Sequence, residues 1–325
     1  MMRVWPMGMA RAGSIVGNTM SWSMRAVVVE HPGGPDVLAL VELPVPEPGS
    51  GDVVVEVEAV GVNPVDCGNR ADPSWAGIEA PYVVGYEFAG RIVGSGEEVW
   101  GLLPVQGTRY GALAERVVVP QDLVAPRPPG LDPVTAAALP LAGGTALQVL
   151  ERMRLPQGSW LMVHGAAGGV GHLLVQLARL RGLHMAAATR PADRSRLEAL
   201  GVDLWLDRAE PDPAAAAVRA LGHDLDAVVD LVGGLLEPSL PSVRVGGHAA
   251  TIVDLGGELD LAIDRNLDVH GILVRPGRDS LDALAVEVAA GLRPTVVATY
   301  PLEQAAEAHR RLEAGGVGGK LVVVP

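Results

Sequence analysis

The 325-residue sequence predicts an α/β protein in which a doubly wound parallel sheet follows a compact, partly closed β-rich domain. Three observations support this fold class. A glycine-rich turn at residues 164–171 separates a strand-like apolar run from a helix-like one. Strand and helix patterns then alternate as far as residue 275. Before the turn, short strand patterns are punctuated by Pro and Gly.

The first 23 residues contain no acidic residue and show neither a helical nor a strand period. Polar residues and a proline interrupt their apolar stretches, so they lack the continuous apolar run of a signal peptide. We expect residues 1–23 to form a disordered extension. The alternative is a start assigned too early, with Met24 as the natural first residue.

From residue 25 the pattern is β. Apolar and acidic residues alternate over 52–60, as expected for a strand with one buried face. Pro-Gly segments at 31–35 and 44–51 separate the first strands. The expected strands cover 25–29, 37–43, 52–60, 87–93, 98–102 and 112–119.

A helix is predicted over 131–150, where Asp132 and Pro133 form a start signal. Beyond it, six strand patterns alternate with helical ones, which predicts a parallel sheet covered on both faces. These strands are expected at 160–163, 184–189, 204–206, 227–231, 248–253 and 269–274. The helices among them are expected at 170–180, 192–200 and 213–221.

The last fifty residues predict helices over 281–290 and 302–313, with strands at 295–299 and 320–324. We expect the final strand to rejoin the sheet of the first domain, because a lone strand leaves its backbone hydrogen bonds unmade.

The glycine turn has the spacing of an anion-binding loop. Gly165, Gly168 and Gly171 fall where a turn must open a helix, approach a pyrophosphate and allow helix-on-strand contact. Free N–H groups at the helix start attract the anion. Ala166 replaces the first glycine of the common motif, and a plain tight turn is the alternative for such a loop taken alone.

Composition excludes several classes of partner. The formal net charge of −13 argues against a surface for nucleic acid. The single cysteine, Cys67, excludes an intrachain disulfide framework and a cysteine-based structural zinc site, and is typical of a cytoplasmic protein. No apolar run approaches the roughly 20 residues of a membrane span.

Six segments resemble, in order, those of the medium-chain dehydrogenase/reductase superfamily. Within it, they are most similar to the zinc-independent quinone oxidoreductase (zeta-crystallin-like) branch. The resemblance runs from about Met24 to the C-terminus. The segments are 61–66, 81–90, 110–120, 136–145, 163–171 and 318–323.

This resemblance implies a Rossmann sheet inserted into a GroES-like catalytic domain. The catalytic domain would cover 24–145, the NADP-binding domain 146–275, and 276–325 would return to the catalytic domain. It also implies a cleft between the domains, where NADPH passes hydride to an electron-poor acceptor, and a homodimer paired through the edges of its cofactor-domain sheets. The strand at 269–274 is apolar enough to form such an edge.

Zinc-dependent relatives carry Cys and His where this chain has Asn63 and Tyr86. Neither replacement is a good zinc ligand, so no metal is expected. His164 and His172, which flank the glycine loop, are interpreted as loop and helix residues.

The end of the second strand of the parallel sheet favours NADPH over NADH. No acid stands at its tip, and Arg190 and Arg194 follow Thr189 where they can pair with a 2′-phosphate. The alternative is that both arginines only solvate a helix start, and Asp193 would weaken a phosphate site. The expected cofactor-binding residues are Thr145 (by resemblance alone), Gly165, Gly168, Gly169, Val170, Gly171, Thr189, Arg190 and Arg194.

The expected catalytic residues are Asn63, by its place in the family's Asn-Pro-x-Asp segment, and Tyr86, by its place at a former metal-ligand position. Their alternatives are a turn residue and a packing residue. Tyr110 is a second possible donor, Asp66 is expected to orient the loop, and Cys67 to line the cleft without acting as a nucleophile.

These observations predict an NADPH-dependent, zinc-independent reductase of a quinone or an activated alkene (enone). Two alternatives stay open: an enoyl-thioester reductase in a biosynthetic pathway, and a nucleotide-binding protein without catalysis.

Overall fold

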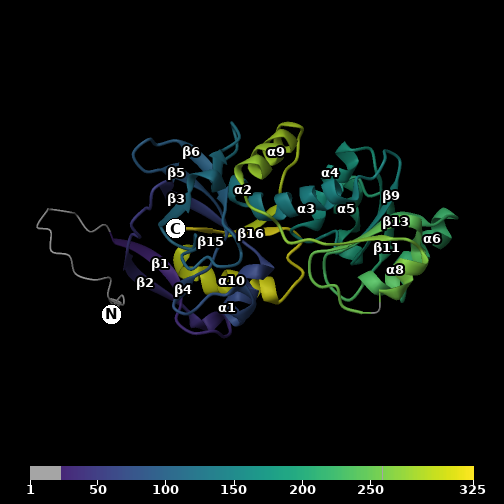
Figure 1. Cartoon of the computed structure of the whole chain (residues 1–325), viewed down its shortest axis with the longest axis horizontal. Coiled ribbons are helices and arrows are strands. Elements are labelled where there is room, and N and C mark those ends of the chain that lie inside the picture. Colours follow the sequence, from purple (N-terminus) through teal and green to yellow (C-terminus); the bar gives the residue numbers. More distant parts are fainter. Residues whose placement is uncertain (1–22, 258) are drawn as a thin grey trace, which may run out of the picture.

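The structure is a computed structural model that describes residues 23–257 and 259–325. Two sheet-containing parts lie side by side, and helix α3 (Pro140–Met153) lies between them (Figure 1). The predicted extension over 1–23 falls outside the described residues except for Ser23, which opens the first strand. The predicted end of that extension is therefore one residue too late.

The β-rich part contains two sheets. Strands β2, β1 and β4 form one, and the order of the other is β15-β16-β3-β5-β6-β8, with β7 paired to β3. The strands are β1 (Ser23–Val29), β2 (Leu38–Pro44), β3 (Asp52–Val62), β4 (Tyr82–Val83), β5 (Glu87–Ile92), β6 (Glu98–Leu102), β7 (Arg116–Pro120), β8 (Val124–Pro126), β15 (Val296–Pro301) and β16 (Lys320–Val324).

The second part is built on a parallel sheet of the order β11-β10-β9-β12-β13-β14. This confirms the predicted doubly wound sheet and its six strands. The order reverses between β9 and β12, and the carboxyl edge at such a point is where ligands bind. The strands are β9 (Trp160–His164), β10 (His184–Thr189), β11 (Leu204–Asp207), β12 (Leu225–Asp230), β13 (Val243–Thr251) and β14 (Asp268–Gly271).

The helix predicted over 131–150 is two helices. Pro140 has no N–H to donate and stands at the first turn of α3, so the earlier helix α2 ends before it. The remaining helices are α1 (Pro64–Ala71), α2 (Pro133–Ala137), α4 (Gly171–Leu180), α5 (Arg194–Leu200), α6 (Pro213–Leu221), α7 (Leu236–Ser239), α8 (Asp260–Asp264), α9 (Arg278–Ala289) and α10 (Ala305–Glu313). Within the described ranges no helix is long and apolar enough to cross a membrane.

The final strand returns to the first part, as expected. β16 pairs antiparallel with β3, with Leu321 opposite Val62, and β15 pairs parallel with β16. Figure 1 shows the yellow C-terminal segment beside the purple and blue strands. This return brings residue 320 next to the glycine loop. The domain boundaries at 145 and 275 stay predictions.

Candidate active site

The glycine loop follows β9 at the point where the strand order reverses. Gly165 has φ +81°, and a Cβ there would lie 2.7 Å from Val232 Cγ1. A Cβ on Gly171 would lie 2.3 Å from the carbonyl oxygen of Gly165. Both positions therefore require glycine, one for its backbone angle and one for close contact between helix start and turn. Val170 caps α4.

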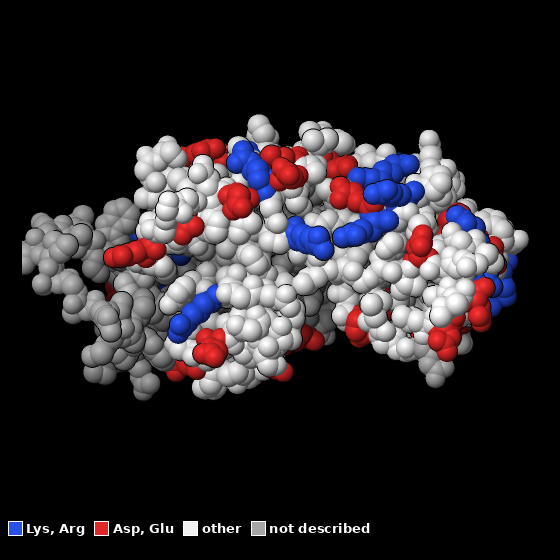
Figure 2. Space-filling view, viewed as in Figure 1, with Lys and Arg blue, Asp and Glu red and all other residues white. Residues whose placement is uncertain are grey.

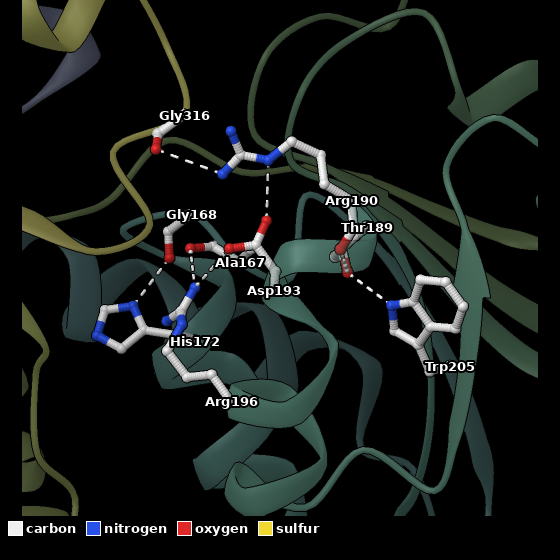
Figure 3. A network of polar contacts seen from close by, with 9 residues as sticks. All are labelled: Ala167, Gly168, His172, Thr189, Arg190, Asp193, Arg196, Trp205 and Gly316. Carbon is white, nitrogen blue, oxygen red and sulfur yellow. Dashed lines mark hydrogen bonds and ion pairs between the residues drawn. The ribbon is translucent and has the colours of Figure 1, made fainter.

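Two arginines hold Asp193 beside the loop (Figure 3). Arg190 Nε donates to Asp193 Oδ2 at 3.0 Å, and Arg190 also donates to the carbonyl of Gly316 at 3.3 Å. Arg196 donates to the loop carbonyl of Ala167 at 3.1 Å and contacts Asp193 Oδ1 at 3.5 Å. Nη1 of Arg196 is buried without a hydrogen-bond partner in the described part of the chain. The structure thus presents a cationic group with an unused donor next to the glycine loop.

Thr189 and Arg194 both contact Trp205. Trp205 Nε1 donates to Thr189 Oγ1 at 3.0 Å, as Figure 3 shows, and the Arg194 guanidinium lies 4.9 Å from the centre of the Trp205 ring. Arg194 also pairs with Glu198 at 2.7 Å. Of the two arginines predicted to bind the 2′-phosphate, Arg190 contacts Asp193 beside the glycine loop, whereas Arg194 lies over Trp205. A phosphate contact of Arg194 stays a prediction.

His172 connects the loop to the segment that precedes β15. Its Nδ1 donates to the carbonyl of Gly168 at 2.8 Å, and its Nε2 accepts from the N–H of Thr295 at 2.9 Å. These two bonds fix the neutral tautomer. Burial lowers the pKa of His172 to about 4, so the ring is neutral at physiological pH. His164 instead contacts Ser239 Oγ at 2.8 Å.

Asn63 belongs to a buried charged cluster, which we call the Lys320 cluster: Asn63, Glu87 and Lys320. Lys320 Nζ lies 2.6 Å from Glu87 Oε1 and also donates to Asn63 Oδ1. Asn63 Nδ2 donates to the same Glu87 oxygen at 2.8 Å, and the N–H of Leu141 donates to the other at 2.7 Å. Each member of the cluster is at most 3% exposed. The Asn63 amide is therefore held in one orientation.

The Lys320 cluster also touches the glycine loop. A Cβ on Gly169 would lie 3.2 Å from Lys320 Cδ, and the backbone N–H of Lys320 donates to the carbonyl of Thr295 at 2.8 Å. Hydrogen bonds therefore run from the loop through His172 and Thr295 to Lys320 and Asn63. This chain couples the expected cofactor loop to the expected catalytic residue.

Asp66 orients the segment that carries Asn63, as expected. Its Oδ2 accepts the backbone N–H of Asn63 at 2.6 Å, at the start of α1. Its other oxygen is buried without a hydrogen-bond partner among the described residues. Burial raises the pKa of Asp66 to about 7.

Tyr86 is fully buried, and its hydroxyl accepts from Asn69 Nδ2. Burial raises the pKa of Tyr86, so the phenol stays protonated. Tyr110 is 37% exposed. Thr145 is buried on α3 and donates to the carbonyl of Leu141 at 2.7 Å. Roles for these three side chains toward substrate or cofactor stay predictions.

Cys67 is buried between α1 and α10, and its predicted place along the cleft stays a prediction. It is 6% exposed, and burial raises the pKa of its thiol to about 12. Its Sγ lies 3.4 Å from His309 Nδ1, which accepts from Arg70 at 3.2 Å. No such partner neighbours Cys67 in the sequence, because His309 stands on α10 and reaches it only through the packing of α10 against α1.

Sequence reasoning missed Arg196, Glu87 and Lys320 as site residues. Arg196 comes one turn after Asp193, at a spacing that permits the observed contact. Glu87 and Lys320 both lie in segments that carry the family resemblance, but no spacing along the chain links two residues 233 positions apart.

Two family models match the chain. One, described as alcohol dehydrogenase GroES-like domain, matches residues 49–129, and the other, described as zinc-binding dehydrogenase, matches residues 200–323. The chain is also 32% identical to the NADPH-dependent alkenal/one oxidoreductase, chloroplastic, of Arabidopsis thaliana. That alignment covers 93% of this chain and 80% of the relative. The chain belongs to the medium-chain dehydrogenase/reductase superfamily.

Within the superfamily, the chain falls in the zinc-independent quinone oxidoreductase branch. It is similar to the quinone oxidoreductase structure from Coxiella burnetii, with 29% identity and a TM-score of 0.84 over 94% of this chain and 100% of that one. It is also 32% identical to a 2-haloacrylate reductase of Burkholderia sp, over 93% of this chain and 99% of that one. The chain is therefore an oxidoreductase with a GroES-like domain, a Rossmann sheet and a nicotinamide cofactor.

Proposed function

We propose that this medium-chain reductase transfers hydride from NADPH to a quinone or an activated alkene without a metal ion. The observation that carries the proposal is the contact between the two parts of the molecule. The glycine loop meets Lys320 at Gly169, and Lys320 holds the Asn63 amide. Cofactor and acceptor bound on either side of this contact would lie next to each other.

The nicotinamide supplies the hydride when it is bound. The chain's own contribution is positioning, which alone accounts for much of the rate of such reactions. The glycine loop offers N–H groups to the pyrophosphate. The Lys320 cluster fixes the Asn63 amide, and its burial keeps bulk water away from it.

The preference for NADPH is supported by Arg190 and Arg196. Both contact Asp193, which offsets its negative charge, and Nη1 of Arg196 is an unused donor. An orphaned guanidinium donor beside the loop fits an anionic group of the cofactor. A relative with NADPH in its printed name agrees with this preference.

The independence from zinc is supported by the charges around Asn63. The buried ammonium group of Lys320 contacts the side chains of Asn63 and Glu87. A divalent cation at these residues would meet that positive charge and lack thiolate or imidazole ligands.

The test is turnover. Purified protein is mixed with NADPH and a panel of benzoquinones, enones and enoyl-coenzyme A thioesters, with and without a chelator. We expect NADPH oxidation with a quinone or an enone that the chelator leaves unchanged. Turnover of thioesters alone would favour a carrier-bound substrate, and cofactor binding without turnover of any acceptor would indicate a non-catalytic nucleotide-binding protein.

A further inference from the structure

A cavity of about 380 Å³ lies where the carboxyl edge of the parallel sheet meets the β-rich part. Three segments line it: residues 104–106 after β6, Gln148 and Arg152 on α3, and residues 271–276 after β14. The carbonyl of Val105 accepts from Asn69, the same side chain that holds the Tyr86 hydroxyl. Asn69 thus links the cavity wall to Tyr86, a side chain expected at the reacting centre.

A larger cavity of about 600 Å³ also lies near the C-terminal end of α3, beside Arg154 and Leu183. Leu183 precedes β10, so this cavity lies near the amino ends of the strands. Ligands of doubly wound sheets bind at the opposite edge. The smaller cavity is the one placed to receive an acceptor.

The cavity combines apolar walls with two arginines. Val105, Ile272 and Val274 provide apolar surface. Gln148 clamps the backbone of Arg275, because its amide accepts the N–H and donates to the carbonyl, each at 3.0 Å. Arg152 stands one turn after Gln148 on the same helix. The rim of the cavity therefore carries the guanidinium groups of Arg152, which stands on a helix, and Arg275, whose backbone is held by Gln148.

Neither guanidinium is neutralised. In the described ranges no carboxylate pairs with Arg152 or Arg275, although Arg278 nearby pairs with Asp282 at 3.3 Å. The pKa of His270 at the end of β14 is lowered by burial above all, and the charges of His248 and Arg152 lower it further. Figure 2 shows basic side chains near the middle of the molecule, with acidic side chains close by.

We propose that this cavity binds the anionic end of the acceptor, so that the enzyme acts on small activated alkenes that carry a carboxylate. Bidentate pairing with carboxylate oxygens is the interaction that guanidinium groups favour. The volume fits a small acid and leaves the nucleotide of a thioester outside. The inference rests on the proposed function and specifies its substrate class.

A keto-activated alkenoate illustrates the reaction. In 4-oxo-2-pentenoate, hydride from the reduced nicotinamide adds to carbon 2, and the alkene electron pair moves to the ketone oxygen. Water then supplies a proton at carbon 3, so the acid leaves saturated and the cofactor leaves oxidised. The carboxylate takes no part in electron flow and serves only to hold the molecule at Arg152 and Arg275.

The test compares 4-oxo-2-pentenoate with its methyl ester, which lacks the negative charge and adds one methyl group. We expect Arg152→Gln and Arg275→Gln each to raise KM for the acid about tenfold and to change KM for the ester by less than about twofold. Higher ionic strength should raise KM for the acid only. Arg219→Gln is the matched control, since Arg219 is exposed on α6 at the opposite side of the sheet, next to β11.

Binding of the saturated acid, 4-oxopentanoate, gives a second readout by calorimetry and should weaken in the same two variants. Equal effects of the substitutions on acid and ester would overturn the anion site while the proposed function stands. No turnover of acid, ester or benzoquinone would overturn both. If crotonyl-coenzyme A depends on both arginines and the free acid is not reduced, the anion belongs to a thioester, and the carboxylate assignment is wrong.

Discussion

The contacts of Asp193 differ from what the sequence alone suggests. Its carboxylate is expected to weaken a phosphate site, yet both of its oxygens face arginines here. The partner of Oδ1 is Arg196, which follows Arg190 and Arg194, the two arginines expected from the sequence to bind phosphate. The local sequence therefore indicates a basic subsite. That Arg196 belongs to it follows only from the packing of α5 against the glycine loop.

Replacing Arg190 or Arg196 by Ala should weaken NADPH binding about tenfold, because each would remove one of the charge-assisted phosphate contacts that we propose. NADH binding should change little. Fluorescence titration of both cofactors measures this. Arg194→Ala tests the other predicted phosphate contact, and Arg219→Ala is the control, since Arg219 is exposed on α6. Equal losses for NADPH and NADH would show that the arginines support the fold without recognising the phosphate.

Asp66 makes the free energy of unfolding of the protein depend on pH, and its contribution falls as the pH rises. Burial raises its pKa from 3.8 to about 7, so the folded protein keeps a proton that the unfolded chain loses. The stabilisation is full below about pH 3.8 and declines as the pH rises toward 7. Asp66→Asn can still accept the N–H of Asn63 but does not titrate.

The free energy of unfolding of Asp66→Asn, relative to the parent protein, should therefore rise between pH 4 and 7, by up to about 4 kcal/mol. Urea unfolding at several pH values measures the difference. A constant difference across this range would mean that Asp66 is ionised in the folded state.

At the scale of elements, β16 carries Lys320 across to β3 and into contact with Glu87. Lys320→Met should cost about 3 to 5 kcal/mol of stability, because it leaves a buried carboxylate without its counter-charge. The double variant with Glu87→Gln removes both charges and should recover much of that loss. Chemical denaturation of the single and double variants measures the coupling.

The exposed pair Arg278 and Asp282 on α9 is the control, with an expected coupling below about 1 kcal/mol. If the losses at Lys320 and Glu87 simply add, the two groups do not act as an ion pair.

Most elements could be predicted because their patterns are local. The six parallel strands and the returning strand were found from apolar runs and glycine stops, whereas α1 was missed. Its residues 64–71 are mostly polar or small, and their helical conformation depends on the Asn63 and Asp66 contacts at its start. The expected strand at 269–274 ends at Gly271, because the following residues leave the sheet to line the cavity.

The residues of the candidate site likewise divide into those recognisable from the local sequence and those whose partners lie far away in the chain. Gly165 and Gly171 were identifiable because the positive φ of Gly165 and the close contact of Gly171 with the Gly165 carbonyl both lie within the loop. The partners of Asn63 and Cys67 were not, because Lys320 and His309 reach them from more than 200 residues away. Periodicity carries no information about such pairs.

At the scale of the whole molecule, β14 ends the parallel sheet and leaves one strand edge without a partner within the described sheet. We propose that two chains pair through this edge, since an uncovered edge favours association. Light scattering should give twice the chain mass of 33.7 kDa. His270→Pro, which removes a backbone donor from β14, should shift the mass toward one chain. A single-chain mass for the parent protein would contradict the proposal.

The pairing of β16 with β3 also sets an order of events at the ribosome. Glu87 is made 233 residues before Lys320, a delay of roughly 10 to 50 s at the usual rate of synthesis. The parallel sheet is contiguous in the chain and can form in that interval. The β-rich part cannot bury Glu87 as an ion until the lysine emerges. Completion of the sheet at β3 thus waits for the later-made β16, and during that wait the β3 edge is a place where chaperones can bind.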